Sequence, residues 1–251
     1  MHRITHDGFL KSLSATSLKQ QLSQIRLTLV LCCAVFLTII AGIVAIGLRT
    51  GTRLDHLVID PVDVDYLMPA YIGMLSHLGV MLWAGSAAVC LFGANLLLRS
   101  WSSGLDVKES GRFLLASGLV ASGLMLDDAL LLHDRVFPWT FHIHELVVFA
   151  VYLGVVLLYL YRFARKILES EYLLLLISGT CLFIMVLMDH LLPFTPLETF
   201  FEDSLKFLGI VFFFAYYART ANALVKKELH LLQKAVHHRS STPVNNVVNV
   251  P

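Results

Sequence analysis

Ionisable residues inside the apolar segments of this 251-residue chain gather where those segments begin or end. In four neighbouring segments they are Asp127, Asp128 and His133 at the end of the first, Glu145 at the start of the next, Asp189 and His190 at the end of the third, and Glu202, Asp203 and Lys206 at the start of the fourth. Charge in apolar surroundings is costly and by default marks function. Carboxylates and imidazoles in such a place can bind a divalent metal or transfer protons.

Charge balance indicates which chemistry these groups support. Their six carboxylates repel one another in a low-dielectric layer unless cations or protons neutralise them, and one lysine is not enough. A divalent metal supplies the missing charge, and ligands without thiolates suit zinc in a hydrolytic site, or iron or manganese in a carboxylate-rich one. We therefore predict metal ligation by His133, Glu145, Asp189, His190, Glu202 and Asp203, and catalysis by Asp127, Asp128 and Lys206.

Composition and segment length fix the elements that must position these residues. Hydrophobic residues make up 57% of the chain and charged residues 15%, against roughly 25% charge in an ordinary soluble domain. Six apolar segments reach the length of about 20 residues that a membrane-crossing helix needs. They are Leu27–Leu48, Pro69–Leu98, Phe113–Leu132, Ile143–Tyr161, Tyr172–Leu192 and Asp203–Ala221. The sequence thus predicts an all-α integral membrane protein, a bundle of six transmembrane helices.

The basic residues predict how this bundle is oriented. They flank the segments in the N-terminal arm, in the loops around Arg99 and Arg165, and in the tail after Arg219. Because short basic loops stay in the cytoplasm, both termini are expected there, in a bacterial inner membrane or a plasma membrane. Residues 1–26 then form a cytoplasmic arm with an interfacial helix, residues 27–221 the transmembrane domain, and residues 222–251 a cytoplasmic helical extension and disordered tail.

Helical geometry predicts that the charged groups share one layer. At a rise of 1.5 Å per residue, Asp127 lies about 22 Å along its helix from Arg112, which is deep in the outer leaflet. Lys206 lies three and four residues after Asp203 and Glu202, so one of these carboxylates should hold it. His133 would lie on the far side of a straight helix and can join the layer only if that helix ends near Leu132.

The general design resembles membrane-embedded zinc hydrolases of the ceramidase and progestin/adipoQ-receptor type, which hold a metal near one end of a helical bundle. That resemblance implies a metal-dependent hydrolase. The chain departs from the pattern because it lacks the closing HxxxH helix, Ser76 and His77 do not reproduce the Ser and His helix of that group, and it has six predicted crossings instead of seven. No residue role is therefore transferred.

Three functions remain open from the sequence. The first is a metal-dependent hydrolase whose lipid substrate enters from the outer leaflet of the bilayer. The second is a proton- or ion-coupled transporter, although the chain shows no inverted repeat and its charged layer lies away from the midplane. The third is an accessory subunit of a membrane complex with a structural polar layer. A nucleic-acid partner is excluded, since the net charge is only +1 and the basic residues form no stripe.

Overall fold

The computed structural model describes residues 15–58, 69, 71–100, 105–193 and 195–241, except for the side chains at 15–17, 145 and 235–241. Its helices are α2 (Ala15–Thr50), α3 (Leu54–Val58), α4 (Met74–Arg99), α5 (Leu105–Leu130), η2 (Leu132–Thr140), α6 (Glu145–Leu168), α7 (Tyr172–Leu191) and α8 (Pro196–Ser241). No strand occurs within these residues. Six of the helices are long and apolar enough to cross a membrane. The predicted helical class and the number of candidate spans are therefore confirmed.

Several helices extend beyond the apolar segments that predicted them. The helix α5 begins at Leu105 instead of Phe113, and α8 begins at Pro196 instead of Asp203. Backbone hydrogen bonding continues through polar turns, and proline is well tolerated at the first helical position because its missing amide hydrogen has no partner there. In contrast, α4 begins late, at Met74, after Gly73 in a left-handed conformation with φ 69°.

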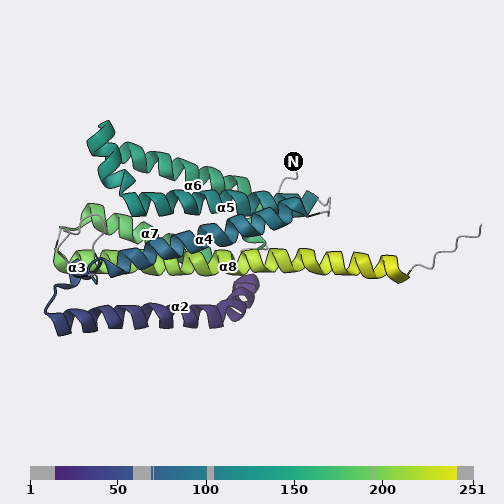
Figure 1. The fold of residues 1–251 in the computed structure, drawn as a ribbon, viewed down its shortest axis with the longest axis horizontal. Coiled ribbons are helices and arrows are strands. Elements are labelled where there is room, and N and C mark those ends of the chain that lie inside the picture. Colours follow the sequence, from purple (N-terminus) through teal and green to yellow (C-terminus); the bar gives the residue numbers. More distant parts are fainter. Residues whose placement is uncertain (1–14, 59–68, 70, 101–104, 194, 242–251) are drawn as a thin grey trace, which may run out of the picture.

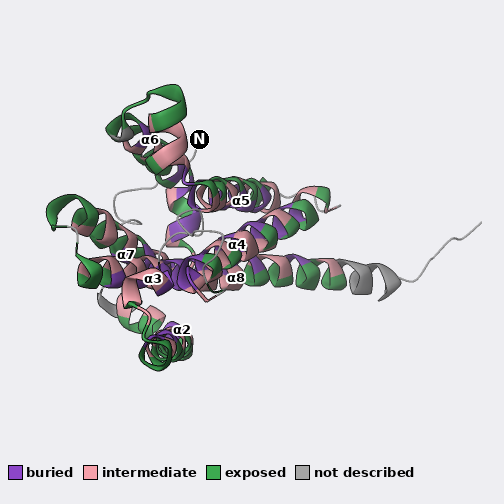
Figure 2. Cartoon of the chain, turned by 60° about the vertical axis from the view of Figure 1, so that its left-hand side comes forward, coloured by how far each residue is buried: buried purple, intermediate pink, exposed green. Residues whose placement is uncertain are grey.

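The core of the bundle lies where α4, α5, α7 and α8 meet. The closest packed pairs are α4 with α5, α7 with α8, and α4 with α8, and Figure 2 shows that buried residues concentrate along them while α2 and α6 are mainly exposed. Glycine permits the α4–α5 approach, since a Cβ added at Gly118 would lie 2.7 Å from side-chain atoms of Leu91.

Tyrosine hydroxyls connect the helices across the middle of the bundle. The Tyr159 hydroxyl of α6 lies 2.8 Å from Oγ of Ser117 on α5 and 2.8 Å from the hydroxyl of Tyr217 on α8. Tyr217 is 1% exposed, so these bonds satisfy polar groups that have no access to water. They hold α6, which is otherwise loosely packed, against α5 and α8.

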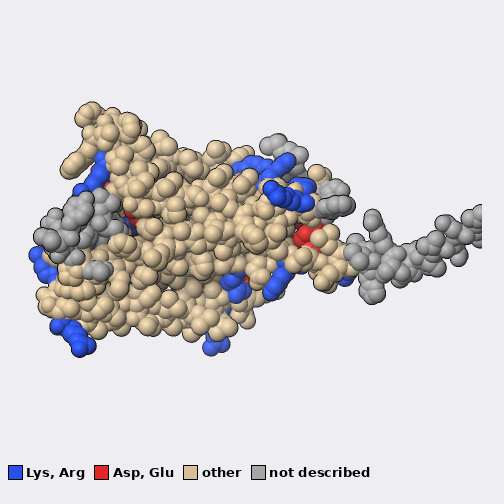
Figure 3. All heavy atoms as spheres, in the orientation of Figure 1, with Lys and Arg blue, Asp and Glu red and all other residues tan. Residues whose placement is uncertain are grey.

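The bundle has two ends of different character. Figure 1 shows that α5 and α7 finish, and α6 and α8 begin, at the same end, which we call the Asp127 end. At the other end, called the Lys166 end, α4 and α6 finish and α5 and α7 begin. Figure 3 shows charged side chains towards both ends of the visible face and a broad band without them between.

Candidate functional site

An unusual backbone segment forms part of the Asp127 end. Beyond α5, Leu131 has a φ angle of 48°, a left-handed conformation that costs a non-glycine residue about 1–2 kcal/mol. The chain then continues as the π-helix η2, in which the amide of Val136 donates to the carbonyl oxygen of Leu131 at 3.1 Å. After η2, His142 is also left-handed, with φ 55°. Strained residues and π-helices both occur frequently at functional sites.

This break in the helix brings His133 back onto Asp127. The His133 amide donates to Oδ1 of Asp127 at 3.0 Å, and its Nδ1 lies 2.8 Å from Oδ2. The hydroxyl of Tyr152 on α6 donates to Oδ1 at 2.7 Å. Because α5 ends at Leu130, close to the predicted position of Leu132, His133 can join the polar layer. Since Nδ1 is engaged by the carboxylate, Nε2 is the ring nitrogen left for a ligand or a proton.

Asp127 favours the charged form of His133. Burial alone would lower the pKa of His133, but the hydrogen bond and negative charge of Asp127 outweigh it, so that the pKa lies above its usual value. The positive charge of Lys206 opposes this increase. A raised pKa means that the protonated ring stabilises the fold at low pH, and this contribution is lost as the pH rises through the raised value.

The neighbouring Asp128 contacts a different helix. Its Oδ1 forms an ion pair with Nζ of Lys206 on α8, and the two side chains are 7% and 19% exposed. Both residues line a small pocket together with Asp203. Gly79 lets α4 approach α8 closely beside this pair, because a Cβ there would lie 3.2 Å from Cδ1 of Ile210.

Other predicted site residues form a third, more exposed group. On α7, Nδ1 of His190 lies 3.2 Å from Oδ2 of Asp189, and the carboxylate of Glu202 on α8 is close enough to Asp189 to interact electrostatically with it. The ring of Phe149 on α6 connects this group to the Asp127 pair, with its centroid 5.3 Å from that of His133 and 5.5 Å from that of His190.

The predicted metal ligands are therefore divided among separate groups. Among the side chains that the structure describes, no three His, Cys, Asp or Glu residues lie together in a way that could hold a metal ion. The side chain of Glu145 lies outside that part. The divalent metal stays a prediction. In the described residues, Lys206 offsets the charge of Asp128, while His133 and Tyr152 donate to Asp127.

Sequence reasoning missed two contacts that define this end. It expected Lys206 to be held within its own helix by Glu202 or Asp203, and the structure adds an ion pair with Asp128 on α5. The available signal was that both residues are flanked by leucine-rich sequence, which favours pairing between helices. Tyr152 was also missed, although it lies seven residues after Glu145 and so on the same helical face.

The fold defines a class of protein, an all-helical bundle with six candidate membrane spans and a polar cluster at one end. The chain belongs to the family described as "Domain of unknown function (DUF8692)", which matches residues 25–220. The matched region contains Asp127, Asp128, His133 and Lys206. Comparison with curated proteins and with solved structures gave no significant match.

Proposed function

We propose that the chain is a multi-pass membrane protein of the plasma membrane, or of the inner membrane in a bacterium, with both termini in the cytoplasm and the Asp127 end in the outer leaflet. The positions of the basic residues support this orientation, since Arg99, Arg165, Lys166 and Arg219 belong to the Lys166 end. The start of α2 and the end of α8 also lie towards that end (Figure 1).

Cysteine labelling tests the orientation. The four native cysteines are replaced by serine, and single cysteines are introduced by Arg165→Cys and Thr195→Cys. A membrane-impermeant maleimide added to intact cells should label position 195 only, whereas opened cells should allow labelling at both positions. Equal labelling of the two positions in intact cells would refute this topology.

We further propose that the Asp127 end is the reactive site of a membrane-embedded hydrolase acting on an ester or amide of a lipid. The observation that carries the proposal is the contact of His133 with both carboxylate oxygens of Asp127, formed through the strained backbone at Leu131. A carboxylate that binds Nδ1 fixes the ring and stabilises its charged form, while Nε2 exchanges a proton with the substrate.

The proposed reaction assigns a role to each of these residues. Nε2 of neutral His133 takes a proton from water as the water oxygen attacks the carbonyl carbon, and the charged ring then gives that proton to the leaving alcohol or amine. Lys206, whose charge acts on His133, stabilises the negative oxygen that forms on the carbonyl. A zinc, iron or manganese ion is a separate part of the proposal, and no step depends on it. A metal bound to Nε2 of His133 would leave that nitrogen no lone pair for the proton, so metal ligation there and this proton transfer are alternatives, with Asp127 holding the other nitrogen in either case.

The test is hydrolysis of defined lipids in nanodiscs. Ceramides, diacylglycerols and phospholipids are incubated with the purified protein, and released fatty acids are measured by mass spectrometry. We expect His133→Gln to reduce the rate by about 10²–10⁴-fold in protein that is still folded at the assay temperature. The matched control is His77→Gln, because Nδ1 of His77 contacts a backbone carbonyl oxygen, that of Gly73 at 2.7 Å, instead of a carboxylate. Equal rates for His133→Gln and the parent would rule out this role.

A specific observation favours a second candidate, an accessory subunit with a structural polar layer. Asp127 bonds to η2 and α6, whereas Asp128 pairs with α8. These contacts therefore also hold the helices of the bundle together. In that case Asp127→Asn should lower thermal stability, and no lipid should be hydrolysed even by the parent.

Elemental analysis of the same preparations tests whether the protein binds a metal. The triple variant with Asp127→Asn, Asp128→Asn and Asp203→Asn should lose any metal that the parent contains.

A further inference from the structure

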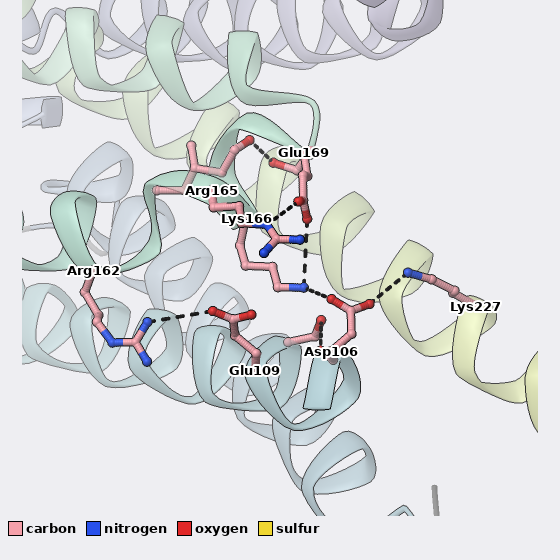
Figure 4. A network of polar contacts seen from close by, with 10 residues as sticks. Asp106, Glu109, Arg162, Arg165, Lys166, Glu169 and Lys227 are labelled. Atoms are coloured by element: carbon pink, nitrogen blue, oxygen red, sulfur yellow. Dashed lines mark hydrogen bonds and ion pairs between the residues drawn. The ribbon is translucent and has the colours of Figure 1, made fainter. Parts of the chain in front are cut away.

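A dense ion-pair network fastens the helices at the Lys166 end (Figure 4). Asp106 at the start of α5 accepts from Lys166 of α6 and from Lys227 of α8, the latter at 3.0 Å. Lys166 is only 6% exposed, and Glu169 lies 3.9 Å from its ammonium group. A buried ammonium with two carboxylates nearby is held in a fixed position.

A pocket of about 670 Å³ lies beside this network. Its polar walls include Gln21 of α2, Lys166 of α6, and Arg219, Lys226 and Lys227 of α8. Phe113 and Leu224 are among its apolar lining residues. This volume lies within the range of roughly 300–1,000 Å³ that is usual for small-molecule sites.

Most of the charged groups in the wall are already engaged. Arg219 donates from Nη2 to Oε1 of Glu171 at 2.5 Å and from Nη1 to Oγ1 of Thr28 at 2.8 Å. Two groups remain. In the part of the chain that the structure describes, Lys226 forms no ion pair, and the buried Oε1 of Gln21 accepts no hydrogen bond. The wall thus offers one ammonium group for an anion and one amide acceptor for a donor.

We propose that this pocket binds the phosphate-bearing headgroup of a glycerophospholipid. Four cations line the pocket, against Glu169 and Glu171 in its wall and Asp106 beside it, so one positive charge is left over and favours a phosphate at Lys226. The buried Oε1 of Gln21 accepts a hydrogen bond from a hydroxyl or ammonium group of the same headgroup. Phe113 and Leu224 provide apolar surface for the glycerol end. The inference rests on the membrane placement proposed above, in which the Lys166 end faces the cytoplasmic leaflet.

Native mass spectrometry of the full chain tests the site. The detergent-solubilised protein is titrated separately with phosphatidylglycerol, phosphatidylethanolamine, glycerol 3-phosphate and inorganic phosphate. Lys226→Gln should weaken phosphatidylglycerol binding about fivefold. Its control is Lys234→Gln, an exposed lysine of α8 that does not line the pocket and should leave binding unchanged.

Each outcome decides the proposal. Saturable lipid binding that is weakened by Lys226→Gln, and weakened again by Gln21→Leu, supports the headgroup site. Equal losses with Lys226→Gln and Lys234→Gln would mean general attraction to basic residues and would overturn it. Glycerol 3-phosphate binding as tightly as the lipid would assign the phosphate site to a soluble ligand and overturn the lipid assignment. His133→Gln should retain lipid binding, so that failure of the hydrolase and failure of this site are distinguishable.

Discussion

Lys206→Met is the sharpest perturbation of the Asp127 end, because methionine keeps most of the side-chain volume and removes only the charge. The substitution takes the ammonium group away from Asp128, whose side chain is 7% exposed. Removing one partner of a buried ion pair typically costs about 3–5 kcal/mol, whereas an exposed pair contributes about 0–1 kcal/mol. The exposures of 7% and 19% put this pair in the first group.

A double-mutant cycle measures the interaction itself. The melting temperatures of Lys206→Met, Asp128→Asn and the double variant are compared in one detergent. A loss of about 3–5 kcal/mol corresponds to roughly 6–20 °C for a chain of this size. The double variant should recover part of that loss, because its asparagine carries no charge to be left in the pocket, with a coupling of about 1–3 kcal/mol.

Additive effects would refute the reasoning. If the double variant loses the sum of the two single losses, Asp128 and Lys206 do not stabilise each other. A loss below about 1 kcal/mol for Lys206→Met alone would mean that its ammonium group is solvated like that of a surface lysine. Arg135→Met, at a half-exposed arginine near the same end, controls for the general loss of a positive charge.

Two further predictions concern α5 and the π-helix η2 that follows it. Thermal stability should fall as the pH rises from below about 6.5 through the raised pKa of His133, and His133→Gln should flatten that dependence. NMR titration of the ring measures this pKa directly. A value at or below about 6.5 would contradict the contact with Asp127. Gly118→Ala should cost about 1–3 kcal/mol, because its Cβ would lie 2.7 Å from side-chain atoms of Leu91. Gly123→Ala, where nothing lies within 4 Å of the added Cβ, should be neutral or stabilising by up to about 1 kcal/mol, and equal losses at the two glycines would disprove the close packing.

Apolar length was enough to predict the helices, since about 20 consecutive apolar residues have few alternatives to a membrane-crossing helix. It could not predict where they end, because the backbone hydrogen bonds of α8 continue through polar residues to Ser241. The positions of the charged groups within these apolar segments were enough to predict that they lie near the ends of the helices. Their partners, however, depend on how helices that are far apart in the sequence pack together. Lys206 therefore contacts Asp128, and Tyr152 contacts Asp127, neither of which periodicity alone could identify.

The contacts at the Lys166 end could not be predicted from the sequence either. Its basic residues were interpreted as flanks that set orientation, because in sequence they are scattered over several loops. Packing brings two lysines to one carboxylate, that of Asp106: Lys166 lies 60 residues further along the chain and Lys227 lies 121 residues further. A network of this kind leaves no local pattern, and neither does the pocket beside it.

Asp127 and Asp128 explain why a structural role and a reactive role at this end depend on the same contacts. Consecutive residues of a helix point about 100° apart, so the two carboxylates avoid each other and reach different neighbours. One holds α8 through Lys206, and the other holds η2 through two hydrogen bonds from His133. Those bonds, at about 1.5–3 kcal/mol each when an ionised group takes part, offset the strain of about 1–2 kcal/mol at Leu131. The contacts that fasten the bundle are therefore also those that keep Nε2 of His133 in one orientation.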